Sequence, residues 1–277
     1  MSGPSGPVRH LRSAAGNGDV LEATPATVGW RFVSFRVVRL EAGASLDVSS
    51  EDQEQLVVPL TGAALLQVHG ADHEVRRDSV FTQAADVLYL PPRVPCIVRA
   101  ETAFEVAIGG APAEGRYAAR LYRAAELATF VRGGANVRRG VTVTLDPTFA
   151  SERLIAYEIV TPSGNWSSFP PHRHDGREGT TYHEETYYYR LDPADGFAVQ
   201  RLYTRDTDLD VAIPVGDGDL VMVHEGYHAV ATAPGTNAYY LNILAGESKP
   251  VVQRNDPAYD WVAGDWEGRP AAVPVGD

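Results

Sequence analysis

A chain of 277 residues of which 44% are hydrophobic is long enough to bury a substantial core, in one large domain or two smaller ones. Its formal net charge of −12 argues against nucleic acid or an anionic membrane as a partner, and no apolar run approaches the length of a membrane span. The single cysteine, Cys96, excludes an intramolecular disulfide. Because a signal-peptide pattern is also lacking, we expect a cytoplasmic protein.

The predicted elements are almost all β-strands. Residues 1–20 begin with a stretch rich in Gly, Pro and Ser, which predicts a flexible N-terminal segment. Many short strands with turn signals and little helix between them predict an all-β sandwich or barrel. The runs that predict strands are, in chain order, residues 31–38, 55–58, 63–68, 87–90, 141–145 and 154–160.

The strand pattern occurs twice along the chain. In the first half, Glu54 opens a strand that leads to the segment 86–95. In the second half, Glu185 opens a strand that leads to the segment 219–228, which has the same length and also begins with aspartate. Repetition of this kind predicts two copies of one structural unit.

The two copies suggest a division into units at residues 21–130 and 131–277. The first copy has no pair of histidines before its glutamate, and Pro95 stands where the second copy has His228. We therefore expect a degenerate first barrel without metal ligands and a second barrel that binds metal.

The second half contains residues of the types and spacing that bind metals. His172 and His174 are two apart, so on an extended strand both imidazoles project to the same face. Glu185 follows at the start of the next predicted strand, and His228 comes at the end of a later one. Three imidazoles and one carboxylate suit a borderline divalent cation and leave coordination positions for a substrate.

Longer stretches around these residues resemble a known family, the 5-deoxy-glucuronate isomerases of myo-inositol catabolism. The resemblance implies a bicupin, two tandem cupin β-barrels, and an aldose–ketose isomerisation of 5-deoxy-D-glucuronate to 5-dehydro-2-deoxy-D-gluconate. It covers nearly all of the chain except its ends. The stretches that carry it are Gly164-Asn-Trp-Ser-Ser-Phe-Pro-Pro-His-Arg-His-Asp175, Glu184-Glu-Thr-Tyr-Tyr-Tyr-Arg190, Gly196-Phe-Ala-Val-Gln-Arg-Leu-Tyr-Thr204, Gly226-Tyr-His228 and Tyr239-Tyr-Leu-Asn-Ile-Leu-Ala-Gly246.

By proton transfer, such an isomerisation removes a proton from C2, stabilises an enediolate and returns a proton to C1. A hydride shift between the two carbons is the alternative, and the sequence does not choose between them. If Glu185 points inward, the period of two along a strand turns Tyr187 and Tyr189 inward as well. Either hydroxyl is then a candidate to donate a proton or a hydrogen bond to the substrate. The same alternation places Glu184 on the opposite face, where we expect solvent.

The substrate that the resemblance implies also carries a carboxylate, which favours an arginine as its partner. Arg201 on a predicted strand is the first candidate, with Arg190 and Arg139 behind it. Tyr227 and Trp166 are further candidates for substrate contacts, because they lie next to the predicted ligands or on the same strand.

Three kinds of alternative stay open at this point. One is a cupin dioxygenase, which would use iron at the same four ligands. Another is a sugar-binding or regulatory cupin that catalyses no reaction. Within the isomerases, the enzyme of pectin degradation that acts on 4-deoxy-5-hexosulose uronate is the competitor. Zinc is the expected metal, but manganese, iron and nickel accept the same donors. We expect a small sugar acid as the partner, and a homo-oligomer is compatible with the sequence.

Overall fold

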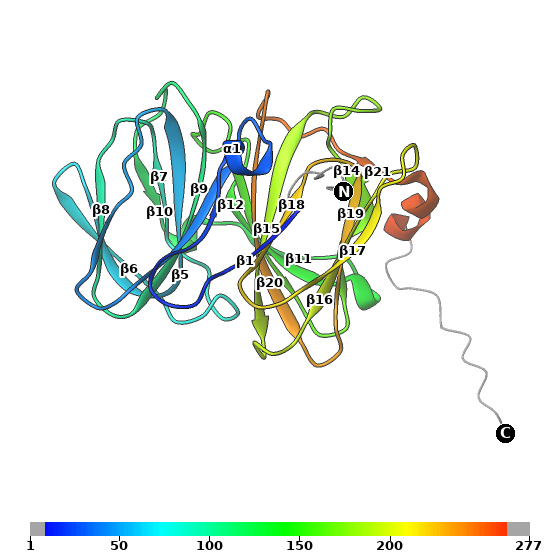
Figure 1. Ribbon diagram of the computed structural model, residues 1–277, viewed down its shortest axis with the longest axis horizontal. Coiled ribbons are helices and arrows are strands. Elements are labelled where there is room, and N and C mark those ends of the chain that lie inside the picture. The colour runs from blue at the N-terminus through cyan, green and yellow to red at the C-terminus, as the bar shows by residue number, and fades with distance from the viewer. Residues whose placement is uncertain (1–8, 265–277) are drawn as a thin grey trace, which may run out of the picture.

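The computed structural model describes residues 9–264 and consists of two β-structures that lie side by side (Figure 1). Strands dominate, so the prediction of an all-β fold is confirmed. None of the helices in this part of the chain is long and apolar enough to cross a membrane. The helical pieces are α1 (Pro25–Val28) and the 3-10 helices η1 (Ala124–Glu126), η2 (Ala135–Val137) and η3 (Pro257–Gly264).

The first half is a nine-stranded sheet in which the long strand β5 belongs to two layers. Six strands follow one another in the order β10 (Arg120–Tyr122), β7 (Val87–Leu90), β5 (Gln53–Val68), β9 (Phe104–Pro112), β3 (Ser34–Leu40) and β2 (Gly18–Ala23). Three more strands lie off this path. Of these, β6 (Ala71–Arg77) and β8 (Cys96–Ala100) pair with β5, and β4 (Ser45–Asp47) pairs with β8. The start of β5 pairs with β7 and β9, and its end pairs with β6 and β8. Gly62 lies at this change of layer with φ +94°, and a Cβ there would lie 2.1 Å from the carbonyl oxygen of Ala103. Glycine is therefore required at the bend.

The second half is built from a seven-stranded and a five-stranded sheet. The larger sheet has the order β1 (His10–Arg12), β18 (Asp219–Val223), β15 (His183–Asp192), β20 (Asn237–Gly246), β13 (Ile155–Thr161), β12 (Arg139–Leu145) and β11 (Thr129–Arg132). The smaller sheet has the order β17 (Asp210–Val215), β16 (Ala198–Tyr203), β19 (Tyr227–Thr232), β14 (Trp166–Arg173) and β21 (Arg254–Asn255). The larger sheet holds Glu185, and the smaller one holds His172 and His228.

The N-terminal segment differs from the expectation of flexibility over residues 1–20. His10–Arg12 forms β1, which pairs antiparallel with β18 at the edge of the seven-stranded sheet. The ring of His10 also lies 2.8 Å from the Oδ2 atom of Asp219. Strand β2 begins at Gly18, so part of the predicted segment is ordered sheet, whereas residues 1–8 lie outside the described residues. The N-terminus therefore completes the second half of the molecule.

The predicted boundary between residues 130 and 131 falls inside β11. All four residues of this strand pair with β12, so the seven-stranded sheet already begins at Thr129. The division of the chain into a unit of residues 21–130 and a unit of residues 131–277 stays a prediction.

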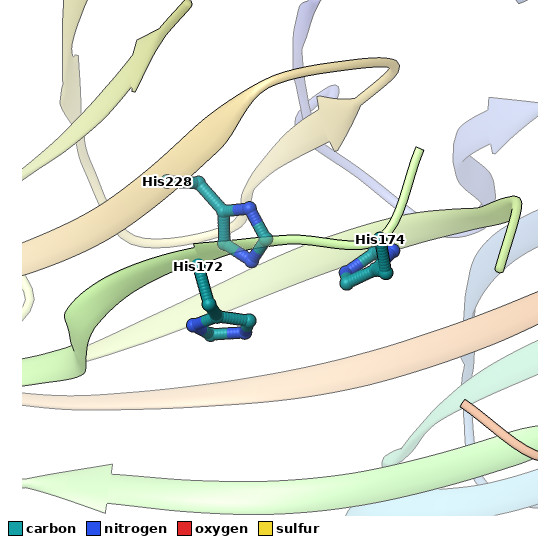
Figure 2. Close-up of side chains that lie close together, drawn as sticks. All are labelled: His172, His174 and His228. Atoms are coloured by element: carbon teal, nitrogen blue, oxygen red, sulfur yellow. The ribbon is translucent and has the colours of Figure 1, made fainter. Parts of the chain in front are cut away.

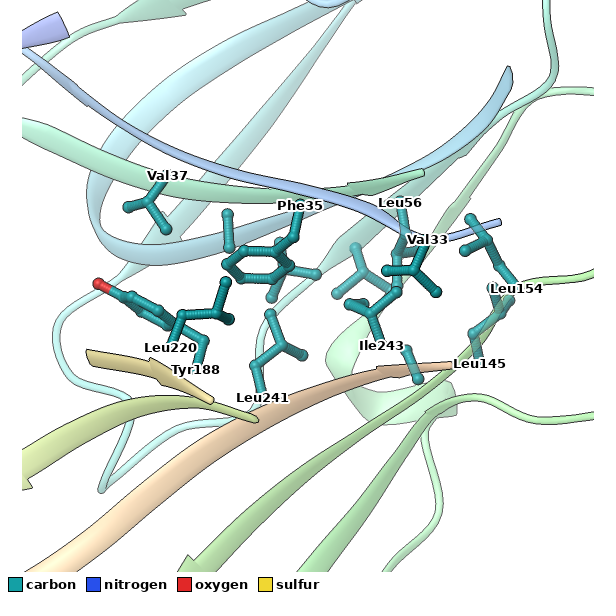
Figure 3. Close-up of a cluster of buried hydrophobic side chains, with 14 of the residues drawn as sticks. Val33, Phe35, Val37, Leu56, Leu145, Leu154, Tyr188, Leu220, Leu241 and Ile243 are labelled. Atoms are coloured by element: carbon teal, nitrogen blue, oxygen red, sulfur yellow. The ribbon is translucent and has the colours of Figure 1, made fainter. Parts of the chain in front are cut away.

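The two halves pack face to face through a shared core. Figure 3 shows Val33, Phe35 and Leu56 from the first half beside Tyr188, Leu241 and Ile243 from the second. All six side chains are buried. The contact is so close that a Cβ on Gly109 would lie within 3 Å of three side-chain atoms of Ile243. Each half therefore buries an outer face that an isolated barrel would expose to water.

Two buried glutamates connect the halves in the same way, and one of them is Glu184, for which the strand alternation predicted solvent. Glu184 is not in solvent: it is fully buried and accepts the backbone N–H groups of residues 31–33. Glu54 is equally buried and accepts the backbone N–H groups of residues 152–154. Each carboxylate thus binds the segment that leads into a strand of the opposite half.

The sheet register shows the same relation between the two copies. In the first half, Glu54 lies opposite Ala111, and in the second half Glu184 lies opposite Ala245, both on the equivalent neighbouring strand. The repeat therefore aligns Glu54 with Glu184, one residue away from the alignment with Glu185. Gln55 occupies the position of Glu185, so the first half has an amide where the second has a carboxylate.

Candidate metal centre

Three strands bring the four predicted ligands together. His172 lies near the end of β14 and His174 just beyond it, and their spacing of two sends both rings into the same space. His228 on β19 is the register partner of His172. Glu185 reaches the same place from β15 of the other sheet. The candidate centre therefore lies between the two layers of the second half.

The side chains converge closely. One ring nitrogen from each of the three histidines lies within 4.8 Å of the others, and Figure 2 shows the three imidazoles grouped in one place. The Oε2 atom of Glu185 lies 2.9 Å from Nε2 of His174 and 3.2 Å from Nε2 of His228. The three imidazoles therefore have the spacing of a metal site, and Glu185 lies next to two of them.

The protonation of His172 and Glu185 favours cation binding. Burial lowers the pKa of His172 well below its usual value, and the neighbouring imidazoles of His228 and His174 add to this effect. Burial opposes ionisation of Glu185, but the hydrogen bond from His174 and the nearby imidazoles of His174 and His228 outweigh it and lower its pKa. For His174, burial lowers the pKa, and the hydrogen bond and charge of Glu185 outweigh it and raise the pKa. The centre thus contains a neutral imidazole and an anionic carboxylate, which are forms that bind metals.

The polar atoms at the centre fit a metal ion. His228 is fully buried, and neither of its ring nitrogens has a hydrogen-bond partner in the described part of the chain, because the approach of Glu185 lacks hydrogen-bond geometry. A buried imidazole without partners is costly, and a cation would satisfy it. The backbone carbonyl oxygen of His183 holds the ring of His174 in place, since it lies 3.1 Å from Nδ1 of His174. Such a contact leaves Nε2 for the metal.

A cavity of about 440 Å³ opens beside the centre. His172, His174 and Glu185 line it, whereas His228 lies behind them. Tyr187 lines it too, and its hydroxyl lies 3.0 Å from Oγ of Ser168. Burial raises the pKa of Tyr187 well above its usual value, so its phenol keeps its proton. The cavity therefore offers a polar hydroxyl next to the candidate ligands.

The chain matches the model of one known protein family over most of its length. The KduI/IolB family matches residues 8–262 of the 277. The chain belongs to the KduI/IolB family. This confirms the resemblance that the sequence stretches indicate, and it covers both halves of the molecule.

Similar proteins support the same family. A protein of Geobacillus kaustophilus (strain HTA426) named 5-deoxy-glucuronate isomerase is 39% identical over 250 residues, which cover 88% of this chain and 91% of that protein. The protein of the same name from Bacillus subtilis (strain 168) is 34% identical over 249 residues, covering 88% of this chain and 92% of that protein. The chain therefore matches these members of the KduI/IolB family over nearly their whole length.

Solved structures support the fold. An IolB-like protein from Salmonella typhimurium LT2 superposes with a TM-score of 0.87 at 34% identity, over 92% of this chain and 99% of that one. A mutant of Bacillus subtilis oxalate decarboxylase superposes with a TM-score of 0.66 at 14% identity, over 91% of this chain and 80% of that one. The second likeness concerns the fold alone. The prediction of a bicupin is confirmed.

Tyr189, the second predicted catalytic tyrosine, lies away from the cavity. It is fully buried, and its hydroxyl donates to Oε1 of Gln200 at 2.9 Å. Tyr240, which the sequence analysis did not single out, lines the cavity instead and lies 3.4 Å from Ser168 through its hydroxyl. It is the register partner of Tyr189 on β20, so only the pairing of the two strands reveals its position.

The expected substrate arginines are placed differently in this KduI/IolB family member. Arg201 does not line the cavity: it is 43% exposed and binds both carboxylate oxygens of Asp210 at 2.8 Å. Arg190 lies between the halves, where it is paired with Glu105 and Asp217. Both arginines have carboxylate partners outside the cavity, and substrate contacts for them stay a prediction.

Tyr227 and Trp166 do not line the cavity either. The ring of Tyr227 packs beneath the guanidinium of Arg173, and its hydroxyl lies 3.4 Å from Glu178. Trp166 is 38% exposed and contacts the edge of Phe169. Neither side chain has access to the cavity in this arrangement, and substrate contacts for them stay a prediction.

Arg139, the third arginine considered, lines the cavity together with Arg132. No motif marked Arg132 in the sequence. It comes from β11, whose pairing with β12 could not be read from the local pattern.

Proposed function

We propose that this protein isomerises 5-deoxy-D-glucuronate to 5-dehydro-2-deoxy-D-gluconate, a step of myo-inositol degradation. Relatives that carry the name of this activity are 32–39% identical to the chain over most of its length. The observation that carries the proposal is the group of three histidines and Glu185 beside a cavity that Tyr187, Arg139 and Asn242 help to line. This arrangement suits a substrate with adjacent carbonyl and hydroxyl oxygens.

His172, His174, Glu185 and His228 would hold one divalent cation. When bound, such an ion acts as a Lewis acid that polarises the substrate carbonyl and lowers the cost of the developing enediolate. We propose zinc first, with manganese, iron and nickel as alternatives, because the donors do not discriminate among them. Bacillus subtilis oxalate decarboxylase, a solved structure with the same fold, has Mn(II) centres. Manganese should therefore be tested beside zinc in the assay.

The chain's own residues would position the substrate and hold protons. Tyr187 keeps its phenolic proton and can donate it in a hydrogen bond to a substrate oxygen next to the ligands. Ser168 fixes the direction of that hydroxyl, and Tyr240 lies within reach of the same serine. The burial of His174, Glu185 and His228 limits the access of bulk water to the reacting end. A small sugar acid is thus the proposed partner, and a cytoplasmic location stays a prediction.

The first experiment is the metal content of the purified protein, compared between the wild type and His172→Ala, together with an anaerobic isomerase assay. We expect about one metal ion per chain in the wild type, its loss in the variant, and loss of turnover with it. His73→Ala serves as the control, because His73 is on β6 of the first half, outside the cavity. Retention of both metal and activity in His172→Ala would sink the proposed centre.

The same assay separates the alternatives. Turnover without oxygen argues against the dioxygenase, and any turnover argues against a purely sugar-binding protein. Metal binding with no turnover of 5-deoxy-glucuronate would keep the centre and reject the substrate. The 4-deoxy-5-hexosulose uronate of pectin degradation would then be the next substrate to test.

A further inference from the structure

A pair of arginines lies on the cavity wall, where it could bind a carboxylate. Arg132 on β11 and Arg139 on β12 are register partners in an antiparallel pair, and both line the cavity that contains the candidate metal ligands. Cross-strand partners on one face are near neighbours, so two positive charges face each other there. Like charges directly opposite each other destabilise a sheet. An anion bound between the two arginines would remove this repulsion.

The two guanidinium groups differ in how they are held. Arg139 is buried, and its Nη1 donates to the carbonyl oxygen of Val137 at 2.9 Å while Nη2 lies 3.4 Å from that of Phe169. Arg132 makes no side-chain hydrogen bond or ion pair with any residue in the range 9–264. One arginine is therefore fixed in place, and the other is available to close on a ligand.

The electrostatics of the pair favour an anion. Burial lowers the pKa of Arg139, and the charge of Arg132 contributes in the same direction. The other acidic group on the wall besides Glu185 is Asp146, which accepts hydrogen bonds from the backbone and hydroxyl of Thr148. In a protein of net charge −12, a local positive pair would offset the general repulsion of an anionic substrate.

The spacing also suits a sugar acid. The guanidinium of Arg139 contacts Phe169 on β14, and His172 follows three residues later on that strand. At roughly 3.3 Å per residue, the two points are at most about 10 Å apart along the strand. An extended six-carbon acid has a comparable length, so its carbonyl end can lie at the metal ligands while its carboxylate reaches the arginines.

We propose that Arg132 and Arg139 together bind the carboxylate of the substrate and make the enzyme selective for sugar acids over neutral sugars. The proposal rests on the proposed function for the identity of the substrate. It assigns to this pair the role that the sequence had suggested for Arg201. Arg139 supplies the fixed part of the site, and Arg132 supplies the second donor.

The test compares the metal-loaded wild type with Arg132→Gln in the isomerase assay. The substrates are 5-deoxy-glucuronate and the neutral aldose with a hydroxymethyl group in place of the carboxylate. Loss of one charge-assisted hydrogen bond should lower kcat/KM for the acid by about 10- to 100-fold, mainly through KM. The neutral substrate should be unaffected, so the preference for the acid falls by the same factor.

Two further variants keep the test sharp. Arg138→Gln removes the same charge next to Arg139 from a side chain outside this cavity, and it should leave the preference unchanged. Arg139→Lys keeps the charge but loses the two-pronged geometry, and it should weaken the preference about 10-fold. An unchanged preference in Arg132→Gln, or an equal loss in Arg138→Gln, would overturn the proposal.

Failure of the proposed function is recognised separately. If the wild type does not isomerise 5-deoxy-glucuronate, the carboxylate site can still be tested by binding. Calorimetric titration then measures the affinity for gluconate and for sorbitol, its neutral counterpart. Weaker gluconate binding in Arg132→Gln than in Arg138→Gln would support the pair. Equal affinity in all proteins, or no gluconate binding by the wild type, would refute it.

Discussion

At the scale of single residues, the centre distinguishes two tyrosines that the sequence treats alike. Tyr187 and Tyr189 point to the same face of β15, and their rings stack with centroids 6.3 Å apart. Only Tyr187 lines the cavity, whereas the hydroxyl of Tyr189 is committed to Gln200. The same chemical group thus has access to substrate in one case and a structural contact in the other.

The matched variants Tyr187→Phe and Tyr189→Phe should therefore behave differently. We expect Tyr187→Phe to lower kcat by about 100-fold, because it removes a proton donor at the reacting end. Tyr189→Phe should keep kcat and lose about 1–2 kcal/mol of the free energy of unfolding, since Oε1 of Gln200 loses its donor. Steady-state kinetics and urea unfolding of both variants check this. Equal kcat values in the two variants would remove Tyr187 from the catalytic group.

At this scale, the sequence predicts a site residue only when neighbouring residues along the chain reveal where its side chain points. His172 and His174 could be found because their spacing alone places both rings on one face. Arg132 on the cavity wall could not be found in this way, because its strand β11 carries no motif. Arg201 was chosen as an arginine on a strand, but its partner Asp210 lies on the adjacent strand β17, which only the pairing reveals.

At the scale of elements, β15 explains the error over Glu184. Alternation along a strand predicts one buried and one solvated face, and here both faces are buried over most of the strand. The inner face lines the centre, and the outer face packs against the first half. A strand with two buried faces cannot be recognised from one sequence when its second face contains a glutamate and several tyrosines.

Glu184→Gln and Glu54→Gln should each destabilise the protein by about 2–3 kcal/mol. Each carboxylate accepts three backbone N–H groups in a buried place, and an amide presents hydrogens where acceptors are needed. Urea unfolding measures the effect, and Glu101→Gln on an exposed turn is the control. A loss below about 0.5 kcal/mol would mean that the carboxylates do not hold the halves together.

A separate prediction for an element concerns Cys96 at the start of β8. Burial raises the pKa of this thiol to about 12, and the side chain is fully buried. The thiolate is the reactive form, so the native protein should resist iodoacetamide at pH 8, whereas the unfolded protein should react completely. Mass spectrometry of both samples measures the modification. Rapid labelling of the native protein would show that β8 opens readily.

At the scale of the whole molecule, the shared core has a consequence for folding. The largest cluster of buried hydrophobic residues contains side chains from both halves, so separating them would expose it to water (Figure 3). The repeat in the sequence predicts two similar units and gives no sign that their outer faces meet. The reciprocal contacts of Glu54 and Glu184 add polar links across the same interface.

We therefore expect the two halves to unfold in one cooperative transition, even though they repeat one fold. Hydrogen exchange in urea, followed by mass spectrometry, should give the same midpoint for residues 56–58 of β5 and residues 187–189 of β15. Ile243→Ala should lower the free energy of unfolding by about 2–5 kcal/mol and shift both midpoints equally, because Ile243 is fully buried against Gly109 of the other half. Val211→Ala, at a partly exposed position on β17, should shift neither. Two separate midpoints, or a shift confined to β15, would mean that the halves are independent domains and that the first could be removed without loss of the metal centre.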